Sequence, residues 1–178
     1  MKANPNHAAV SPVVGVMLML VVTIIIAAVV SAFAGGMSKE TNKAPQATIS
    51  GSYSISGGMS FTHNGGDPIG TPSVKVVVHP AESFGTSTHL VDTVNASSIT
   101  DGSGIQWLKD NGQYGVKSFR AGDTAYVRPP YHEASFLQPS ASRVSYFNNP
   151  ENIGKSFWIE LLDQKGKMIA KTEVTIDP

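Results

Sequence analysis

The side chains that most often carry chemistry are sparse in this 178-residue chain. It has no cysteine, which excludes disulfides, thiol nucleophiles, cysteine-ligated zinc and iron–sulfur clusters. The histidines beyond the N-terminal region show neither the H-x-H nor the H-E-x-x-H spacing of a metal site. They are His63, His79, His89 and His132. We therefore expect surface or half-buried histidines, no metal and no other cofactor.

Aspartates and glycines also lack the pattern of a catalytic site. No G-x-S-x-G nucleophile motif is present, and the glycine doublets lack the strand–loop–helix context of a phosphate-binding loop. Six aspartates are considered as catalytic candidates, and they lie mostly at expected turns, where the side chain commonly bonds its own backbone. They are Asp67, Asp92, Asp101, Asp110, Asp123 and Asp163. We expect a protein that is not an enzyme, and an anchored hydrolase built on two of these carboxylates is an alternative.

The overall charge argues against nucleic acid as a partner. Lys and Arg number 13, Asp and Glu number 13, and only 15% of residues are charged. An average soluble protein has about 25% charged residues. A protein that binds DNA or RNA without sequence preference needs excess basic charge to displace counterions, and this chain has none.

The elements that would position any site fall into two parts, of which the first is strongly apolar. Residues 8–38 contain no Asp, Glu, Lys or Arg, and residues 13–33 are almost continuously apolar. About 20 apolar residues span a hydrocarbon core of roughly 30 Å, and in lipid a single segment satisfies its backbone only as a helix. Ser11 followed by Pro12 predicts the helix start. Since every face is apolar, lipid or other helices must surround it.

The apolar segment is too long for a cleaved secretory signal, whose apolar region has about 7–15 residues. Lys2 is the only firm charge before it, which favours a cytoplasmic N-terminus and a larger domain outside.

The order of residues in this segment resembles the N-terminus of archaeal type IV pilins. The matching run extends from Ala8 to Val30, and its most specific part is Ser-Pro-Val-Val-Gly at residues 11–15. Residues 59–69 also resemble a hydrophobic-Thr-His-x-Gly-Gly-Asp stretch found downstream in such proteins.

This resemblance implies a leader peptide at residues 1–9, removed by a prepilin peptidase. The expected scissile bond is Ala9–Val10, with Ala8–Ala9 as the alternative. Family leaders often carry Lys or Arg just before the small residue at the cut, where this chain has Ala8 or His7. The chain also lacks the glutamate that bacterial type IV pilins carry near the helix start, so subunit registration must come from packing.

The resemblance further implies a structural filament subunit, for adhesion or related surface functions. Its partners would be copies of itself, an assembly ATPase, a membrane platform and, before assembly, the lipid bilayer. The precursor would lie in the cell membrane with its C-terminal domain outside, and the assembled form in an extracellular filament. The helix-start motif would be Ser11, Pro12 and Gly15. The filament-core helix would use Val13, Val16, Leu18, Leu20, Val22, Ile25, Val29 and Phe33.

The second part, residues 45–178, is predicted to be all-β, after a helix and junction at residues 10–44. Apolar and polar residues alternate with a period near two at residues 48–55, 73–78, 124–127, 143–147, 156–162 and 168–176. Turn sequences separate these runs, among them residues 57–58, 64–68 and 164–167. The chain is therefore assigned to the α+β class: a long N-terminal hydrophobic helix followed by an Ig-like β-sandwich.

Two further features bear on surface function. Asn95-Ala96-Ser97 is the only N-x-[ST] sequon, and an outside domain would present it for N-glycosylation. The aromatic and proline-rich residues 126–136 fit either an adhesive or subunit-contact loop or an ordinary irregular loop. The alternative function is a permanently membrane-anchored extracytoplasmic β domain that binds sugar, surface layer or another protein.

Overall fold

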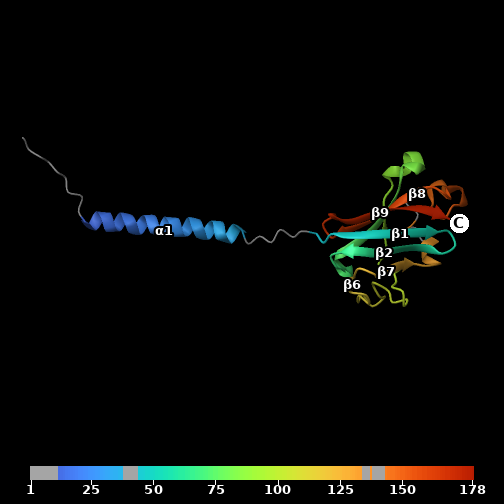
Figure 1. Ribbon diagram of the computed structural model, residues 1–178, viewed down its shortest axis with the longest axis horizontal. Coiled ribbons are helices and arrows are strands. Elements are labelled where there is room, and N and C mark those ends of the chain that lie inside the picture. The colour runs from blue at the N-terminus through green and yellow to red at the C-terminus, as the bar shows by residue number, and fades with distance from the viewer. Residues whose placement is uncertain (1–11, 38–43, 134–136, 138–142) are drawn as a thin grey trace, which may run out of the picture. The chain divides into compact units, whose positions relative to one another are not determined.

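The computed structural model describes residues 12–37, 44–133, 137 and 143–178. The chain divides into two compact units, Met1–Lys43 and Ala44–Pro178. The first unit contains a helix and the second a β domain (Figure 1).

The described part of the first unit is one helix, α1, which runs over Pro12–Met37 and has 26 residues. It begins at Pro12, where a missing backbone N–H costs nothing. The β-branched run at residues 21–26 stays helical. The hydroxyl of Thr23 donates to the carbonyl of Leu20 at 2.9 Å, so this polar group is satisfied inside the helix. The predicted apolar helix is thus confirmed.

The β domain is built on a seven-stranded sheet with the order β5-β4-β8-β9-β1-β2-β7. All neighbours are antiparallel except β1 and β9. The strands are β1 (Ala47–Ser54), β2 (Gly58–Gly66), β4 (Val74–Pro80), β5 (Asp92–Val94), β7 (Thr124–Val127), β8 (Ser156–Asp163) and β9 (Met168–Asp177). A separate pair joins β3 (Ile69–Gly70) to β6 (Ser118–Phe119). Short 3-10 turns are η1 (Thr71–Ser73), η2 (Glu82–His89), η3 (Tyr131–Glu133), η5 (Arg143–Ser145) and η6 (Pro150–Asn152).

The α+β class is confirmed, and its layers are parts of one curled sheet (Figure 1). The parallel pairing of β1 with β9 covers only Tyr53 with Ile176 and Ser54 with Asp177. The rest of β1 passes close to side chains of β8 and β9. A Cβ at Gly51 would lie 2.7 Å from Cγ2 of Val174, so a larger residue there would displace the side chains packed against β1.

Aromatic side chains fill the core in two groups. Tyr53, Phe84, Phe147 and Phe157 form one group, in which the rings of Phe147 and Phe157 stack with centroids 4.1 Å apart. The other group is Phe61, Trp107 and Phe119, packed edge to face or tilted. Pairs of this kind stabilise a fold by about 0.5–1.5 kcal/mol beyond the area they bury.

Most predicted strands are present, and two expectations were wrong. Strands at residues 48–55, 73–78, 124–127, 156–162 and 168–176 correspond to β1, β4, β7, β8 and β9. The predicted strand at 143–147 instead begins with η5, and the predicted turn at 64–68 begins inside β2, which continues to Gly66. Pairing with β1 holds this stretch extended, because Ala47 lies opposite Gly66 and Thr48 opposite Gly65.

Candidate functional site

The most distinctive surface of the described chain is α1 itself. Its side chains are exposed from Pro12 to Phe33, with Met19 and Phe33 each 72% exposed. The 22 residues Pro12–Phe33 are long and apolar enough to cross a membrane by length and composition. At roughly 25 cal/mol per Å² of apolar surface, leaving such a helix in water is costly. The helix cannot cover this surface by itself and therefore requires an apolar environment around it.

The predicted core positions lie on two opposite sides of the helix rather than on one. At 3.6 residues per turn, Val16 and Leu20 lie on one side of the helix and Leu18 lies on the opposite side. The exposed side-chain fractions at the predicted positions extend from 44% at Val22 to 72% at Phe33. The positions are Val13, Val16, Leu18, Leu20, Val22, Ile25, Val29 and Phe33. An environment that is apolar on all sides would suit them.

The helix start is described only from Pro12 onward. Ser11 and both candidate leader bonds, Ala9–Val10 and Ala8–Ala9, lie outside the described residues. Gly15 lies in the first turns of α1, and a Cβ there would meet nothing within 4 Å. Glycine costs a helix about 1 kcal/mol relative to alanine. Contacts in the described chain thus give no reason for glycine at this position.

The β domain begins with a hydrogen-bonded arrangement that we call the β-domain clamp, formed by Gln46, His63, Gly66 and Asp67. The carboxylate Oδ2 of Asp67 accepts from the backbone N–H of Gln46 at 3.0 Å, and the N–H of Asp67 donates to the carbonyl of Gln46 at 2.8 Å. Gly66 adopts φ +106°, and a Cβ there would lie 2.3 Å from the carbonyl oxygen of Gln46. The clamp thus fastens the first residues after the junction to the end of β2.

His63 connects the clamp to the domain interior. Its ring is fully buried and lies edge-on to Phe119, with centroids 5.3 Å apart. Nε2 lies 3.0 Å from the carbonyl oxygen of Asp67, and since a carbonyl can only accept, Nε2 is the donor. Its backbone N–H donates to the carbonyl of Asp123 at 2.9 Å. Segment 59–69, noted above for its Thr-His-x-Gly-Gly-Asp order, therefore has a structural role.

Two expectations about the histidines need correction. His63 and His132 are buried, with 0% and 3% exposed, where surface or half-buried positions were expected. Nε2 of His132 donates to the carbonyl of Ile55 at 2.8 Å. Both rings therefore hold backbone segments in place. In the described ranges, no group of three His, Asp or Glu side chains could hold a metal ion.

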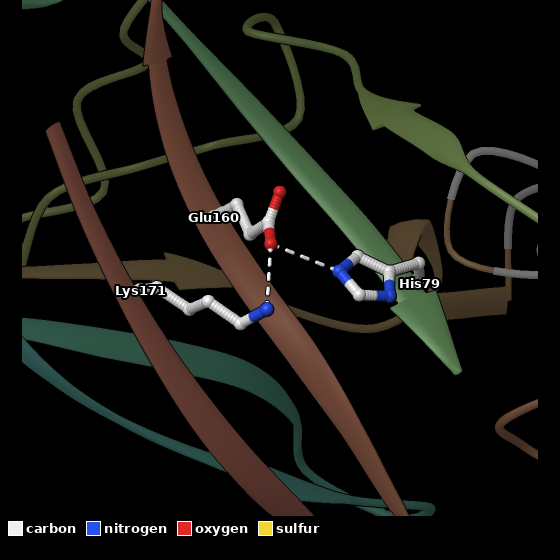
Figure 2. A network of polar contacts seen from close by, with 3 residues as sticks. All are labelled: His79, Glu160 and Lys171. Carbon is white, nitrogen blue, oxygen red and sulfur yellow. Dashed lines mark hydrogen bonds and ion pairs between the residues drawn. The ribbon is translucent and has the colours of Figure 1, made fainter. Parts of the chain in front are cut away.

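One charged network lies on the outer face of β4, β8 and β9 (Figure 2). Oε1 of Glu160 lies 3.0 Å from Nε2 of His79 and 2.9 Å from Nζ of Lys171. Nζ of Lys171 also lies 4.1 Å from the centroid of the Trp158 ring. Burial alone would raise the pKa of Glu160, but the hydrogen bonds and charges of His79 and Lys171 outweigh it and lower the pKa. The network ties the three strands together across the sheet.

The sequon lies in a turn, and the aspartates predicted at turns do so only in part: Asp92 is the first residue of β5, and Asp163 is the last residue of β8. Asn95 directly follows β5 and is exposed, and its Oδ1 accepts from the N–H of Ser97 at 3.0 Å. Asp101, Asp123 and Asp163 bond nearby backbone N–H groups, as expected of turn aspartates. Of the stretch 126–136, residues 134–136 lie outside the described part.

Comparison with known proteins gives two matches. The model of the archaeal type IV pilin N-terminal domain matches residues 8–49. An uncharacterized protein of Archaeoglobus fulgidus is 39% identical over 113 residues, which cover 56% of this chain and 78% of that protein. The first match covers α1 and the beginning of β1.

Proposed function

Because the chain belongs to the archaeal type IV pilin family, we propose that it is a structural subunit of a surface filament, polymerised through α1. The family is a structural, non-enzymatic one whose members assemble with pilus machinery. The observation that carries the proposal is a charge-free helix of membrane-spanning length, exposed on all sides.

The precursor is anchored in the membrane by α1, with its β domain outside. A prepilin peptidase then cuts at Ala9–Val10, or at Ala8–Ala9, and leaves the helix attached. Removing the leader frees the helix start at Ser11 and Pro12 for packing against other subunits. Gly15, for which contacts in the described chain give no reason, lets a neighbouring backbone approach closely there.

In the filament, many copies of α1 form a central bundle and the β domains coat it. Burial of apolar surface stabilises α1 about equally in lipid and in a bundle of like helices. The transfer from membrane to filament is therefore nearly neutral, and its direction must come from an assembly ATPase and a membrane platform. Once in water, the finished polymer resists dissociation because each helix would have to expose its apolar surface.

The β domain forms the outer surface and mediates adhesion or a related surface function. Asn95 is exposed in the turn after β5, which suits attachment of an N-glycan there. Mass spectrometry of the filament subunit would then show a glycan mass that is lost in Asn95→Gln.

Leader removal tests the proposal. Expression with an active prepilin peptidase should give a chain shorter by the leader than expression without it, and the shortened chain should enter shearable filaments. A single uncut form, extracted by detergent as a monomer in both cases, would contradict the proposal and support a permanently anchored β domain.

A further inference from the structure

A hollow on the β domain lies between two turns and the edge strand β7. Its volume is about 550 Å³, within the roughly 300–1,000 Å³ usual for small-molecule sites. One wall is the turn at residues 101–104, and the other is the turn at residues 120–123 that leads from β6 to β7. Glycines with positive φ, Gly104 (+85°) and Gly122 (+94°), allow these turns.

The floor of the hollow is rigid. Trp107 and Phe119 lie beneath it, 1% and 2% exposed, with ring centroids 5.5 Å apart. Phe61 packs against both rings from the core side. Because these rings are already packed, they offer little surface of their own to a lipid or another strongly apolar ligand.

The rim carries two carboxylates held in fixed orientations. Oδ1 of Asp101 accepts from the backbone N–H groups of Ser103 at 2.9 Å and Ile105 at 2.8 Å. Oδ2 of Asp123 accepts from the N–H of Arg120 at 2.8 Å. In the described part of the chain, no hydrogen bond or ion pair engages Oδ2 of Asp101 or Oδ1 of Asp123. Each carboxylate therefore keeps an acceptor oxygen for a ligand without having to reorganise.

Two guanidinium groups balance these charges. Arg128 lies over the ring of Tyr126, with Cζ 4.3 Å from its centroid, and donates to Oγ1 of Thr100 at 3.0 Å. Nε of Arg120 donates to Oγ of Ser118, on the hollow's lining, at 3.2 Å. Neither arginine lines the hollow itself, but their two positive charges lie beside it and offset the two carboxylates, which favours a neutral ligand over an ion.

We propose that this hollow binds a neutral saccharide unit. Sugar hydroxyls both donate and accept, so they can bond the fixed carboxylate oxygens and the serine hydroxyls of the rim at once. A half-open polar site of this kind binds one sugar weakly. Many copies along a filament would bind a glycan-covered surface by avidity, and this last step alone rests on the proposed filament function.

The test uses the full chain in a non-glycosidic detergent, with saturation-transfer NMR titrations of methyl glycosides of mannose, glucose, galactose and N-acetylglucosamine. The double variant Asp101→Asn with Asp123→Asn keeps an acceptor oxygen for each backbone bond but removes both charges. The matched control is Asp163→Asn, because Oδ1 of Asp163 accepts from the N–H groups of Lys165 and Lys167 at 2.8 Å in a turn of the same pattern. Ser103→Trp, at an exposed rim position, fills the hollow and gives a second variant.

We expect the binding of at least one glycoside to reach saturation. Its affinity should fall tenfold or more in the double variant and be lost in Ser103→Trp. In Asp163→Asn the affinity should be unchanged. The proposal is overturned if binding of no glycoside reaches saturation, or if Asp163→Asn weakens binding as much as the rim variants do. Filament formation is scored separately in cells. Rim variants that still assemble but no longer bind sugar separate this proposal from the proposed function.

Discussion

Asp67 and Gln46 exchange two hydrogen bonds, one through the Asp67 carboxylate at 3.0 Å and one through its backbone N–H at 2.8 Å. Gln46 follows the junction between α1 and the β domain by only a few residues, and Asp67 follows the last residue of β2. In a filament, a tensile force between α1 and the β domain would be transmitted to the β domain through the residues around Gln46. The β-domain clamp is therefore placed to keep β1 in the sheet under load.

The clamp predicts that alanine lowers the stability of the β domain at Gly66 but not at the neighbouring Gly65. Gly66→Ala should destabilise the β domain by about 1–3 kcal/mol, because a residue with a Cβ is strained at φ +106° and would meet the carbonyl of Gln46 at 2.3 Å. Gly65→Ala is the control, since a Cβ there meets nothing within 4 Å. Denaturant unfolding of the full chain in detergent would measure both. Equal stability of the two variants would contradict the role given to Gly66.

The charged network on the outer face of the sheet predicts a pH dependence. The pKa of Glu160 is lowered in the folded chain from its ordinary value of 4.5, despite burial, because His79 and Lys171 stabilise the carboxylate. Glu160 therefore contributes stability that is present above about pH 4.5 and is lost as the pH falls through the lowered pKa.

Glu160→Gln tests this dependence. Its free energy of unfolding should be lower than that of the wild type at neutral pH, by about 1 kcal/mol for a part-exposed group, and should fall less on acidification. Glu173→Gln, an exposed position on β9, should keep the acid sensitivity of the wild type. Parallel pH profiles for Glu160→Gln and the wild type would show that the network does not act in this way.

Burial of α1 in a filament core predicts that one charge there abolishes assembly. Val22→Asp should prevent incorporation into sheared filaments, because a lone carboxylate in an apolar bundle is costly. Val144→Asp serves as a control, since Val144 is 65% exposed on the β domain, against 44% for Val22 on the helix. Quantitative immunoblots of filament and membrane fractions would compare them. Normal filaments from Val22→Asp would argue against a buried helix.

The features that sequence patterns predicted are those decided locally. The helix depends on an unbroken apolar run and begins at Pro12, and β4, β8 and β9 follow clear alternation. The pattern at 143–147 also alternates, but the side-chain amide of Asn152 donates to the carbonyls of Val144 at 2.8 Å and Tyr146 at 2.7 Å. The alternation of residues 143–147 therefore gives no indication that they begin with a 3-10 turn instead of forming a strand.

Features that depend on distant partners could not be predicted. The burial of His63 follows from Phe119 and from Asp123, far along the chain, and the extended path of Gly65 and Gly66 follows from β1. The parallel contact between Tyr53 and Ile176 joins the two ends of the β domain. Likewise, the hollow between Asp101 and Asp123 exists only because both turns meet β7.

The central claim is that α1 leaves the membrane to pack among copies of itself. N-terminal sequencing of the subunit in filaments sheared from cells and identified by electron microscopy tests it most directly. We predict filaments whose subunit begins at Val10, or at Ala9, with α1 intact. Finding the chain only in the membrane, beginning at Met1 and absent from every sheared filament, would contradict the claim.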